Sequence, residues 1–224
     1  MKAKEKFSEK GCETELVDLV KQLPAPMREE AEKAWVLVVR GGIKAFVSPD
    51  ALKAEQKKLT PDTKFYHARQ KKVMNKHARY NLCFAPEGHV SDYEKGLGTV
   101  ISYKDVPLLS SIRDQLQDYV GEKARELQCE GNYYFDVTKC GIGFHGDGER
   151  KRVIGLRLGA TIPLHYQWFQ RSKPVGQRFI LNLNHGDLYI MSEKAVGFDW
   201  LLKKKLTLRH AAGSKKYTTI KEKE

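Results

Sequence analysis

The sequence lacks the features that would take a chain across a membrane, out of the cell or into a disulfide framework. Its 224 residues contain no apolar run near the roughly 20 residues that a bilayer-spanning helix needs. The N-terminus, MKAKEKFSEKGCETE, is charged and no apolar segment follows it, so no secretion signal is predicted. The cysteines show no paired short spacing, which is typical of reduced thiols rather than of disulfides or a zinc site. They are Cys12, Cys83, Cys129 and Cys140. We therefore expect an intracellular protein, cytoplasmic or nuclear, that is not secreted and has no membrane partner.

Acidic residues are absent from two long stretches of a chain whose formal net charge is +12. Residues 63–86 and 200–221 contain lysines and arginines but no aspartate or glutamate. Two such stretches favour a surface that contacts the phosphates of nucleic acid, DNA or RNA, over a random basic surface. In the first stretch we expect basic side chains to bind phosphates and tyrosines to stack on bases. These substrate-binding candidates are Arg69, Lys71, Lys72, Arg79, Tyr66 and Tyr80.

The first half of the chain has helical patterns. Residues 12–37 predict two short helices that are broken at LPAPM. Apolar residues at helical spacing predict an amphipathic helix over 106–128, with Asp105 as its N-cap and Pro107 in its first turn.

After Gln128 the pattern changes to short β-branched or aromatic runs separated by glycine, about eight strands in all. This pattern is typical of an antiparallel sandwich or barrel, so the predicted class is α+β with a jelly-roll-like C-terminal half. We expect a helical and basic extension, acting as a lid region, over 1–90. We expect the β core, supported by the helix over 106–128, in 91–224.

The tripeptide His-Gly-Asp occurs twice, at 145–147 and at 185–187. Residues i and i+2 of a strand share a face, so His-x-Asp can offer an imidazole and a carboxylate to one ion. One more histidine would complete a two-His-one-carboxylate triad, which leaves positions on Fe(II) open. The second copy lies between two apolar runs and predicts a hairpin turn. The first copy leads into a segment rich in glycine and charge, so His145 and Asp147 are the metal candidates.

The chain from residue 132 onward resembles the catalytic domain of the AlkB-type Fe(II)/2-oxoglutarate oxygenases. The resemblance rests on the order and spacing of several elements rather than on one motif. They are NYY about a dozen residues before HGD, the long run VIGLRLGATIPLHYQWF, the hairpin RFILNLNHGDLYIM, and a late histidine in TLRHAAG.

The resemblance implies a double-stranded β-helix fold that binds Fe(II) and uses 2-oxoglutarate and O₂ as co-substrates. It implies that His145 and Asp147 are metal ligands and that Asn132 and Tyr134 contact 2-oxoglutarate. It also implies that Glu149 lies beside the substrate base.

The distal histidine departs from the family pattern, because no histidine lies between Gly186 and Lys205. In one register KKLTLR matches the family's final arginine-containing strand, which leaves no distal ligand and a dead site. In the register that we favour, His210 is the ligand and KKYTTIK is the last strand. His185, with Lys194 nine residues later, is a minor alternative for the distal pair.

The favoured register places a lysine where the family has the arginine that binds the far carboxylate of 2-oxoglutarate. Lys216 is the first candidate and Lys221 the second. An ammonium can neutralise a carboxylate but lacks the bidentate geometry of a guanidinium, so we expect weaker or differently angled binding.

These expectations lead to an oxygenase that hydroxylates or oxidatively demethylates a modified base of nucleic acid, with the base turned out of its stack. Two alternatives stay open. One is the same chemistry on a protein side chain, and the other is a catalytically silent nucleic-acid-binding module on the same fold.

Overall fold

The computed structural model describes residues 2–220, and these form two compact units. Unit 1 comprises residues 3–45 together with the chain from Gly141 to the end of the described part, and unit 2 comprises residues 46–140. The structure thus joins the N-terminal segment to the C-terminal half. The functional division predicted at residue 90, between a lid region and an oxygenase core, stays a prediction.

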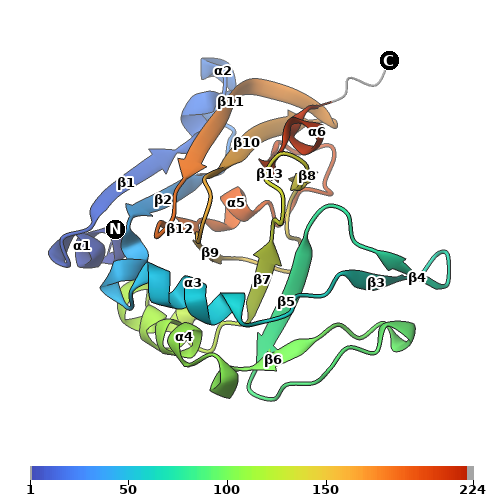
Figure 1. The fold of residues 1–224 in the computed structure, drawn as a ribbon. Helices are drawn as coiled ribbons and strands as arrows, with labels where there is room; N and C mark the ends of the chain where they lie inside the picture. The colour runs from blue at the N-terminus through green and yellow to red at the C-terminus, as the bar shows by residue number, and fades with distance from the viewer. Residues whose placement is uncertain (1, 221–224) are drawn as a thin grey trace. The chain divides into compact units, whose positions relative to one another are not determined.

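Unit 1 is built on two four-stranded sheets, in which every pairing is antiparallel (Figure 1). The first sheet has the order β1-β2-β12-β9 and consists of Glu13–Asp18, Trp35–Arg40, Leu188–Met191 and Val153–Leu156. The second sheet has the order β11-β10-β13-β8 and consists of Lys173–Leu183, Ile162–Gln170, Thr207–Gly213 and Gly141–His145.

The chain passes repeatedly from one sheet of unit 1 to the other. The connections β8–β9, β9–β10, β11–β12 and β12–β13 all cross between the sheets, and β10–β11 stays within one sheet as a hairpin. Gly159, with a φ of 87°, lies in the β9–β10 connection, and Gly186, with a φ of 88°, lies in the β11–β12 turn. Both need the left-handed backbone that glycine adopts without strain.

Large apolar side chains from both sheets fill the core of unit 1. In β2 the central residues 36–39, VLVV, are buried on both faces, which explains why they are apolar throughout rather than alternating. Trp168 of β10 is 1% exposed, and its indole N–H donates to the carbonyl of Leu19 at 2.8 Å. This bond fixes the segment after β1 against the second sheet.

Short helices cover unit 1. They are α1 (Lys2–Glu9), η1 (Leu19–Gln22), α2 (Ala25–Arg28), η2 (Gly42–Ala45), α5 (Glu193–Val196) and α6 (Lys215–Thr218). The prediction of two helices over 12–37, broken at LPAPM, was wrong. Glu13–Asp18 pairs along its whole length with β2, α2 lies at the predicted break, and the residues after it are non-helical until β2 begins. Sheet pairing decided the conformation of a segment whose three apolar residues also fit a helix.

Unit 2 contains a three-stranded sheet, a β-hairpin and two longer helices. The sheet has the order β6-β5-β7 and consists of Val100–Ser102, Tyr80–Ala85 and Cys129–Tyr133, and the hairpin is β3 (Lys64–His67) with β4 (Lys72–Asn75). The helical elements are α3 (Pro49–Lys57), η3 (Tyr93–Lys95), η4 (Tyr103–Asp105), α4 (Pro107–Val120) and η5 (Glu122–Ala124). Leu82, Phe84, Tyr103 and Val106 form a buried cluster.

Helix α4 corresponds to the helix predicted over 106–128 but is shorter. It begins at Pro107, as the sequence predicted, and ends before Gly121, whose φ is 90°. Asp105 is not its N-cap, because it lies in η4. The carboxylate of Glu55 on α3 accepts the free N–H groups of Leu108 and Leu109, at 2.7 and 3.1 Å. A long-range cap of this kind has no local sequence signature.

The α+β class is confirmed. Among residues 2–220, seven strands follow Gln128, β7 to β13, where about eight were predicted. The strand predicted at KKYTTIK is not observed, because residues 215–218 form α6, and Lys221 lies outside the described residues. Among residues 2–220, no helix is long and apolar enough to cross a membrane.

Candidate metal centre

Two neighbouring strands of unit 1 bring a pair of histidines together. His145 ends β8 and His210 lies in β13, and the register of these antiparallel strands places the two residues opposite each other. Their ring centroids are 4.4 Å apart. The pairing explains how residues far apart in the sequence become neighbours on one face of a sheet.

The loop after β8 adds a carboxylate to this pair. Oδ1 of Asp147 lies 3.5 Å from Nε2 of His145. The backbone N–H of Asp147 donates to the carbonyl of Val196 at 3.1 Å, which holds the loop against the end of α5. Gly146 is required there, because a Cβ on it would lie 2.1 Å from the carbonyl oxygen of Gly197.

His145, Asp147 and His210 together form a group with metal-binding geometry, which we call the triad. One ligand atom from each residue lies within 4.8 Å of the others. Among residues 2–220 this is the one group of three or more such side chains that could hold an ion. The donor set is two imidazoles and one carboxylate.

The surroundings favour imidazoles in the form that binds a metal. Nδ1 of His145 lies 2.8 Å from the carbonyl of Gly143, an arrangement in which a proton on Nδ1 leaves Nε2 free toward Asp147. Burial lowers the pKa of His210 to about 3, with further lowering by His145 and Arg150 and an opposing effect of the Ala195 carbonyl. A neutral imidazole is the metal-binding state.

The second His-Gly-Asp copy forms the turn between β11 and β12, as the sequence predicted. The Asp187 carboxylate accepts from the backbone N–H groups of Gly41 and Asn184, each at 2.9 Å, and forms an ion pair of 2.7 Å with Arg40. It therefore ties the turn to the end of β2. The same tripeptide supports the fold at one position and offers ligands at the other.

The alternative distal pair of His185 and Lys194 lies elsewhere. Nδ1 of His185 accepts the backbone N–H of Gly159 at 3.0 Å. Lys194 is 3% exposed, and its ammonium lies 2.7 Å from Asp199 and 3.2 Å from Glu32. These contacts assign Lys194 to a structural ion pair, so it is not available to a ligand at the triad.

The remaining candidates of unit 1 lie on its surface. Glu149 is exposed in the loop that follows Asp147, and its carboxylate lies 3.7 Å from Nε of Arg150. Lys216 is exposed on α6, and its ammonium lies 5.5 Å from the centroid of the Tyr217 ring. Helix α6 forms where a strand was predicted, with Tyr217 packed so closely on β8 that a Cβ on Gly141 would lie 2.6 Å from the ring. The strand that would have carried Lys216 is therefore not formed.

The other co-substrate candidates, Asn132 and Tyr134, belong to unit 2, and their role toward a ligand of unit 1 stays a prediction. Asn132 is exposed on β7 and accepts from Nε of Arg79 at 2.6 Å. Arg79 therefore already has one partner within unit 2.

Beside this contact lies a group of rings, which we call the aromatic patch: the exposed Tyr133 and Phe135 and the half-buried Tyr80. Tyr80 stacks on Phe135, with centroids 4.3 Å apart, and Tyr133 is 55% exposed. Tyr133 and Phe135 were missed as candidates. The signal was the dense aromatic run YYF at 133–135, which is unusual for an exposed segment.

The β3–β4 hairpin carries the other predicted substrate contacts. Arg69 and Lys71 lie in its turn and Lys72 opens β4, and all three are exposed. Lys71 has a φ of 48°, which directs the chain back into β4. Tyr66 lies on β3 and is half-buried. The hairpin thus gathers three cations at one tip.

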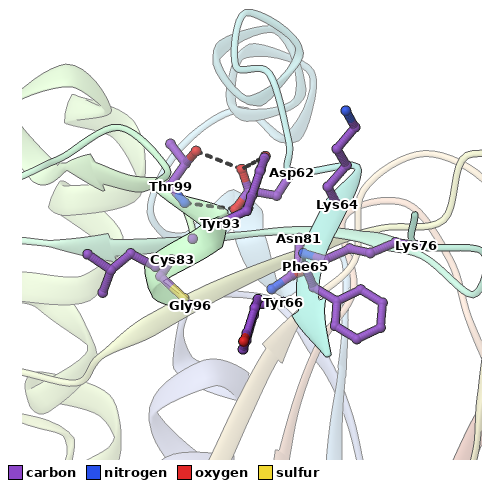
Figure 2. Close-up of a pocket in the computed structure, with 12 residues that line it drawn as sticks. Asp62, Lys64, Phe65, Tyr66, Lys76, Asn81, Cys83, Tyr93, Gly96 and Thr99 are labelled. Atoms are coloured by element: carbon purple, nitrogen blue, oxygen red, sulfur yellow. Dashed lines mark hydrogen bonds between the residues drawn. The ribbon is translucent and has the colours of Figure 1, made fainter. Parts of the chain in front are cut away.

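At the base of this hairpin is a hollow of about 250 Å³ (Figure 2). Its acidic residue, Asp62, accepts from Tyr93 Oη at 2.8 Å and from the backbone N–H and the hydroxyl of Thr99 at 2.7 and 2.6 Å. Lys76 pairs with Asn81 on the same wall. These bonds indicate that the residues lining the hollow hold the loops of unit 2 together.

Comparison with known proteins shows that the chain is similar to a viral protein. No protein-family model matches the sequence. The chain is 46% identical over 218 residues to the uncharacterized protein R156 of Acanthamoeba polyphaga mimivirus, and the match covers 97% of this chain and 84% of that protein. Identity at this level over almost the whole chain indicates common descent and a common fold. The chain belongs to the same family as that mimivirus protein.

Proposed function

We propose that this protein is an Fe(II)- and 2-oxoglutarate-dependent oxygenase that acts on a modified base of nucleic acid. The observation that carries the proposal is the triad, in which ligand atoms of His145, Asp147 and His210 lie within 4.8 Å of one another. Two imidazoles and one carboxylate on one side of an ion are the donor set of non-haem Fe(II) oxygenases. We also propose that the chain from residue 132 onward is AlkB-like, as its resemblance to that family implies.

The fold of unit 1 supports this proposal. Repeated crossing between two four-stranded antiparallel sheets is what a double-stranded β-helix requires, and we propose that unit 1 is a variant of it. The ligands lie at the end of one strand, in the loop that follows and on the neighbouring strand. A rigid sheet pair of this kind holds ligands with little freedom to move.

The residues present fit an iron ion. The loop that carries Asp147 is held by its bond to Val196, and the contact of His145 with Gly143 sets the orientation of that ring. Fe(II), when bound, would supply oxidation of a C–H bond with O₂ and 2-oxoglutarate. The protein's own contribution is to fix the ligands and to keep His210 away from water, since its side chain is 7% exposed.

Features of unit 2 support nucleic acid as the substrate. The hairpin tip presents Arg69, Lys71 and Lys72 to solvent, which suits the phosphates of a strand. The aromatic patch offers exposed ring faces, on which unpaired bases stack without regard to sequence. Exposed cations together with exposed ring faces, both present on unit 2, are the combination that single-stranded nucleic acid binds.

The direct test is incubation of the full chain with Fe(II), 2-oxoglutarate and methylated oligonucleotides of DNA and RNA. We expect succinate together with a demethylated or hydroxylated base, and we expect His210→Ala to abolish both products. The matched control is His185→Ala, which removes the histidine of the other His-Gly-Asp copy and should leave the activity in place.

Other outcomes separate the alternatives. Succinate formation without any modified nucleic acid, together with feeble and salt-independent binding of oligonucleotides, would favour a protein substrate. Tight, salt-dependent binding of nucleic acid by a protein that takes up neither Fe(II) nor Mn(II) would make it a silent binding module. Either result would overturn the proposal.

A further inference from the structure

The interior of unit 1 contains polar atoms that the fold leaves without partners. Nε of Arg157 and the hydroxyl of Tyr166 are buried, and neither has a hydrogen-bond partner among the described residues. Tyr166 is 1% exposed. Buried polar groups are nearly always bonded in folded proteins, so each of these two calls for an explanation.

Arg157 reaches this interior from the end of β9. Strands β9 and β12 pair so that Gly155 lies opposite Tyr189, and the Tyr189 ring occupies the space of a Gly155 side chain, since a Cβ there would be 2.0 Å from the ring. Arg157, two residues further, is on the same face of the chain as Gly155. Its guanidinium carbon is 5.6 Å from the centroid of the Tyr189 ring.

Tyr166 connects this region to the triad. Strand β10 pairs with β13 so that Tyr166 lies opposite His210, and their ring centroids are 6.3 Å apart. Burial raises the pKa of Tyr166 well above its ordinary value, the neighbouring Tyr189 raises it further, and the charge of Arg157 lowers it. A polar row therefore runs from His210 through Tyr166 toward Tyr189 and Arg157.

This row has a donor and a positive charge but no anion of its own. Arg157 forms no ion pair with the described residues, whereas the neighbouring Arg40 is paired with Asp187. A guanidinium has only donors, and a neutral tyrosine hydroxyl can donate one hydrogen bond. Leaving a buried guanidinium Nε–H and a buried hydroxyl without partners is costly, so the row is suited to an acidic ligand that accepts from both.

We infer that Arg157 and Tyr166 bind the far carboxylate of 2-oxoglutarate, in place of the lysines that the sequence suggested. The inference rests on the proposed function, since it assigns a ligand of the triad. It deepens that function by assigning the anchor to Arg157, which directly follows β9, and to Tyr166 of β10. Exposed Lys216 on α6 has no comparable burial, and a guanidinium binds a carboxylate with two parallel hydrogen bonds, which an ammonium cannot do.

The inference is tested by binding rather than by turnover. Calorimetry on the Mn(II)-loaded full chain would compare 2-oxoglutarate with 2-oxopentanoate, in which a methyl group replaces the far carboxylate. We expect the wild type to bind 2-oxoglutarate about ten- to hundredfold more tightly, as a charged hydrogen-bonded pair allows. In Arg157→Gln that preference should disappear, while the affinity for 2-oxopentanoate should stay.

Three further variants complete the design. Arg157→Lys should restore part of the preference, because the charge returns without the bidentate geometry. Tyr166→Phe, which keeps the ring, should reduce the preference several-fold. Lys216→Gln is the matched control and should leave it unchanged. An unaltered Mn(II) affinity in each variant would show that the triad is still folded.

The outcomes distinguish the inference from the function on which it rests. If Arg157→Gln keeps the preference, or if Lys216→Gln loses it, the anchor is wrong and the oxygenase proposal stands. Equal binding of the two keto acids by the wild type would likewise overturn the anchor alone. If the Mn(II)-loaded wild type binds neither acid, the proposed function fails and the anchor with it.

Discussion

His145 and His210 face each other from two hydrogen-bonded strands of unit 1, with their ring centroids 4.4 Å apart. The two residues are 65 positions apart in the sequence, and only the antiparallel register of β8 and β13 makes them neighbours. Asp147 joins them through a loop that Gly146 allows to lie close to Gly197. The geometry of the triad therefore depends on the pairing of β8 with β13 as much as on the His-Gly-Asp motif.

The two His-Gly-Asp copies predict opposite effects of the same substitution. Asp147→Asn should abolish Mn(II) binding and change the free energy of unfolding little, because Asp147 serves the triad. Asp187→Asn should lower the free energy of unfolding by about 2 kcal/mol, because the Asp187 carboxylate is 4% exposed and neutralises Arg40. Its effect on Mn(II) affinity should be small.

Urea denaturation and Mn(II) titration of both variants check this pair of predictions. The two measurements serve as controls for each other, since each variant should alter one and spare the other. A large loss of metal affinity in Asp187→Asn with normal stability would contradict the assignment of the two copies.

Local sequence signals predicted part of this structure and long-range contacts decided the rest. The turn at 185–187 and the start of α4 at Pro107 could be predicted, because glycine and proline act through their own backbone. Strand β1 and helix α6 could not, since pairing with β2 and packing on Gly141 are made by distant residues. The resemblance predicted that His210 lies near His145, whereas the burial of Arg157 Nε, on which the proposed anchor depends, is visible only in the fold.

Gly146 allows a close approach that a methyl group would prevent. A Cβ at this position would lie 2.1 Å from the carbonyl oxygen of Gly197 and 2.7 Å from Cβ of Trp200. Gly146→Ala should therefore displace the loop of Asp147, lower the free energy of unfolding by about 1–3 kcal/mol and weaken Mn(II) binding. Thermal unfolding and Mn(II) titration measure the two effects.

Gly148→Ala is the matched control for this substitution. It lies in the same loop, and a Cβ there would be 3.7 Å from the nearest atom, the carbonyl oxygen of Phe198, which is an ordinary contact. Equal effects of the two substitutions would show that the loop tolerates a side chain at neither glycine and that the close approach of Gly146 is not the cause.

His165 makes the stability of unit 1 depend on pH. Burial lowers its pKa, Arg178 of β11 lowers it further, and its register partners are the uncharged Ile180 and Ala211. In the unfolded chain the His165 imidazole is protonated as the pH falls through about 6.5, whereas in the folded chain it is still neutral there. Protonation therefore favours the unfolded chain, and the free energy of unfolding should fall as the pH drops below about 6.5. His210, whose pKa is about 3, acts in the same direction to lower pH.

The contribution of His165 is measured by comparing pH slopes. Urea denaturation between pH 5 and pH 7.5, a window of about one to two units around the unfolded value, should show a shallower slope for His165→Gln than for the wild type. The slope is the informative quantity, because the substitution also changes packing and thus the absolute stability. Identical slopes would mean that His165 is protonated equally in the folded and unfolded chains.

The hairpin tip should account for part of the salt dependence of nucleic-acid binding. Each cation that pairs with a phosphate of a single strand adds about 0.7 to the slope of log affinity against log salt. Replacing Arg69, Lys71 and Lys72 by alanine should therefore reduce that slope by about 2, whatever the sequence of the strand. A control that removes Lys2, Lys4 and Lys10, which are also exposed, changes the net charge equally. If both triple variants lower the slope alike, the chain binds strands through its overall charge and the hairpin is no specific contact.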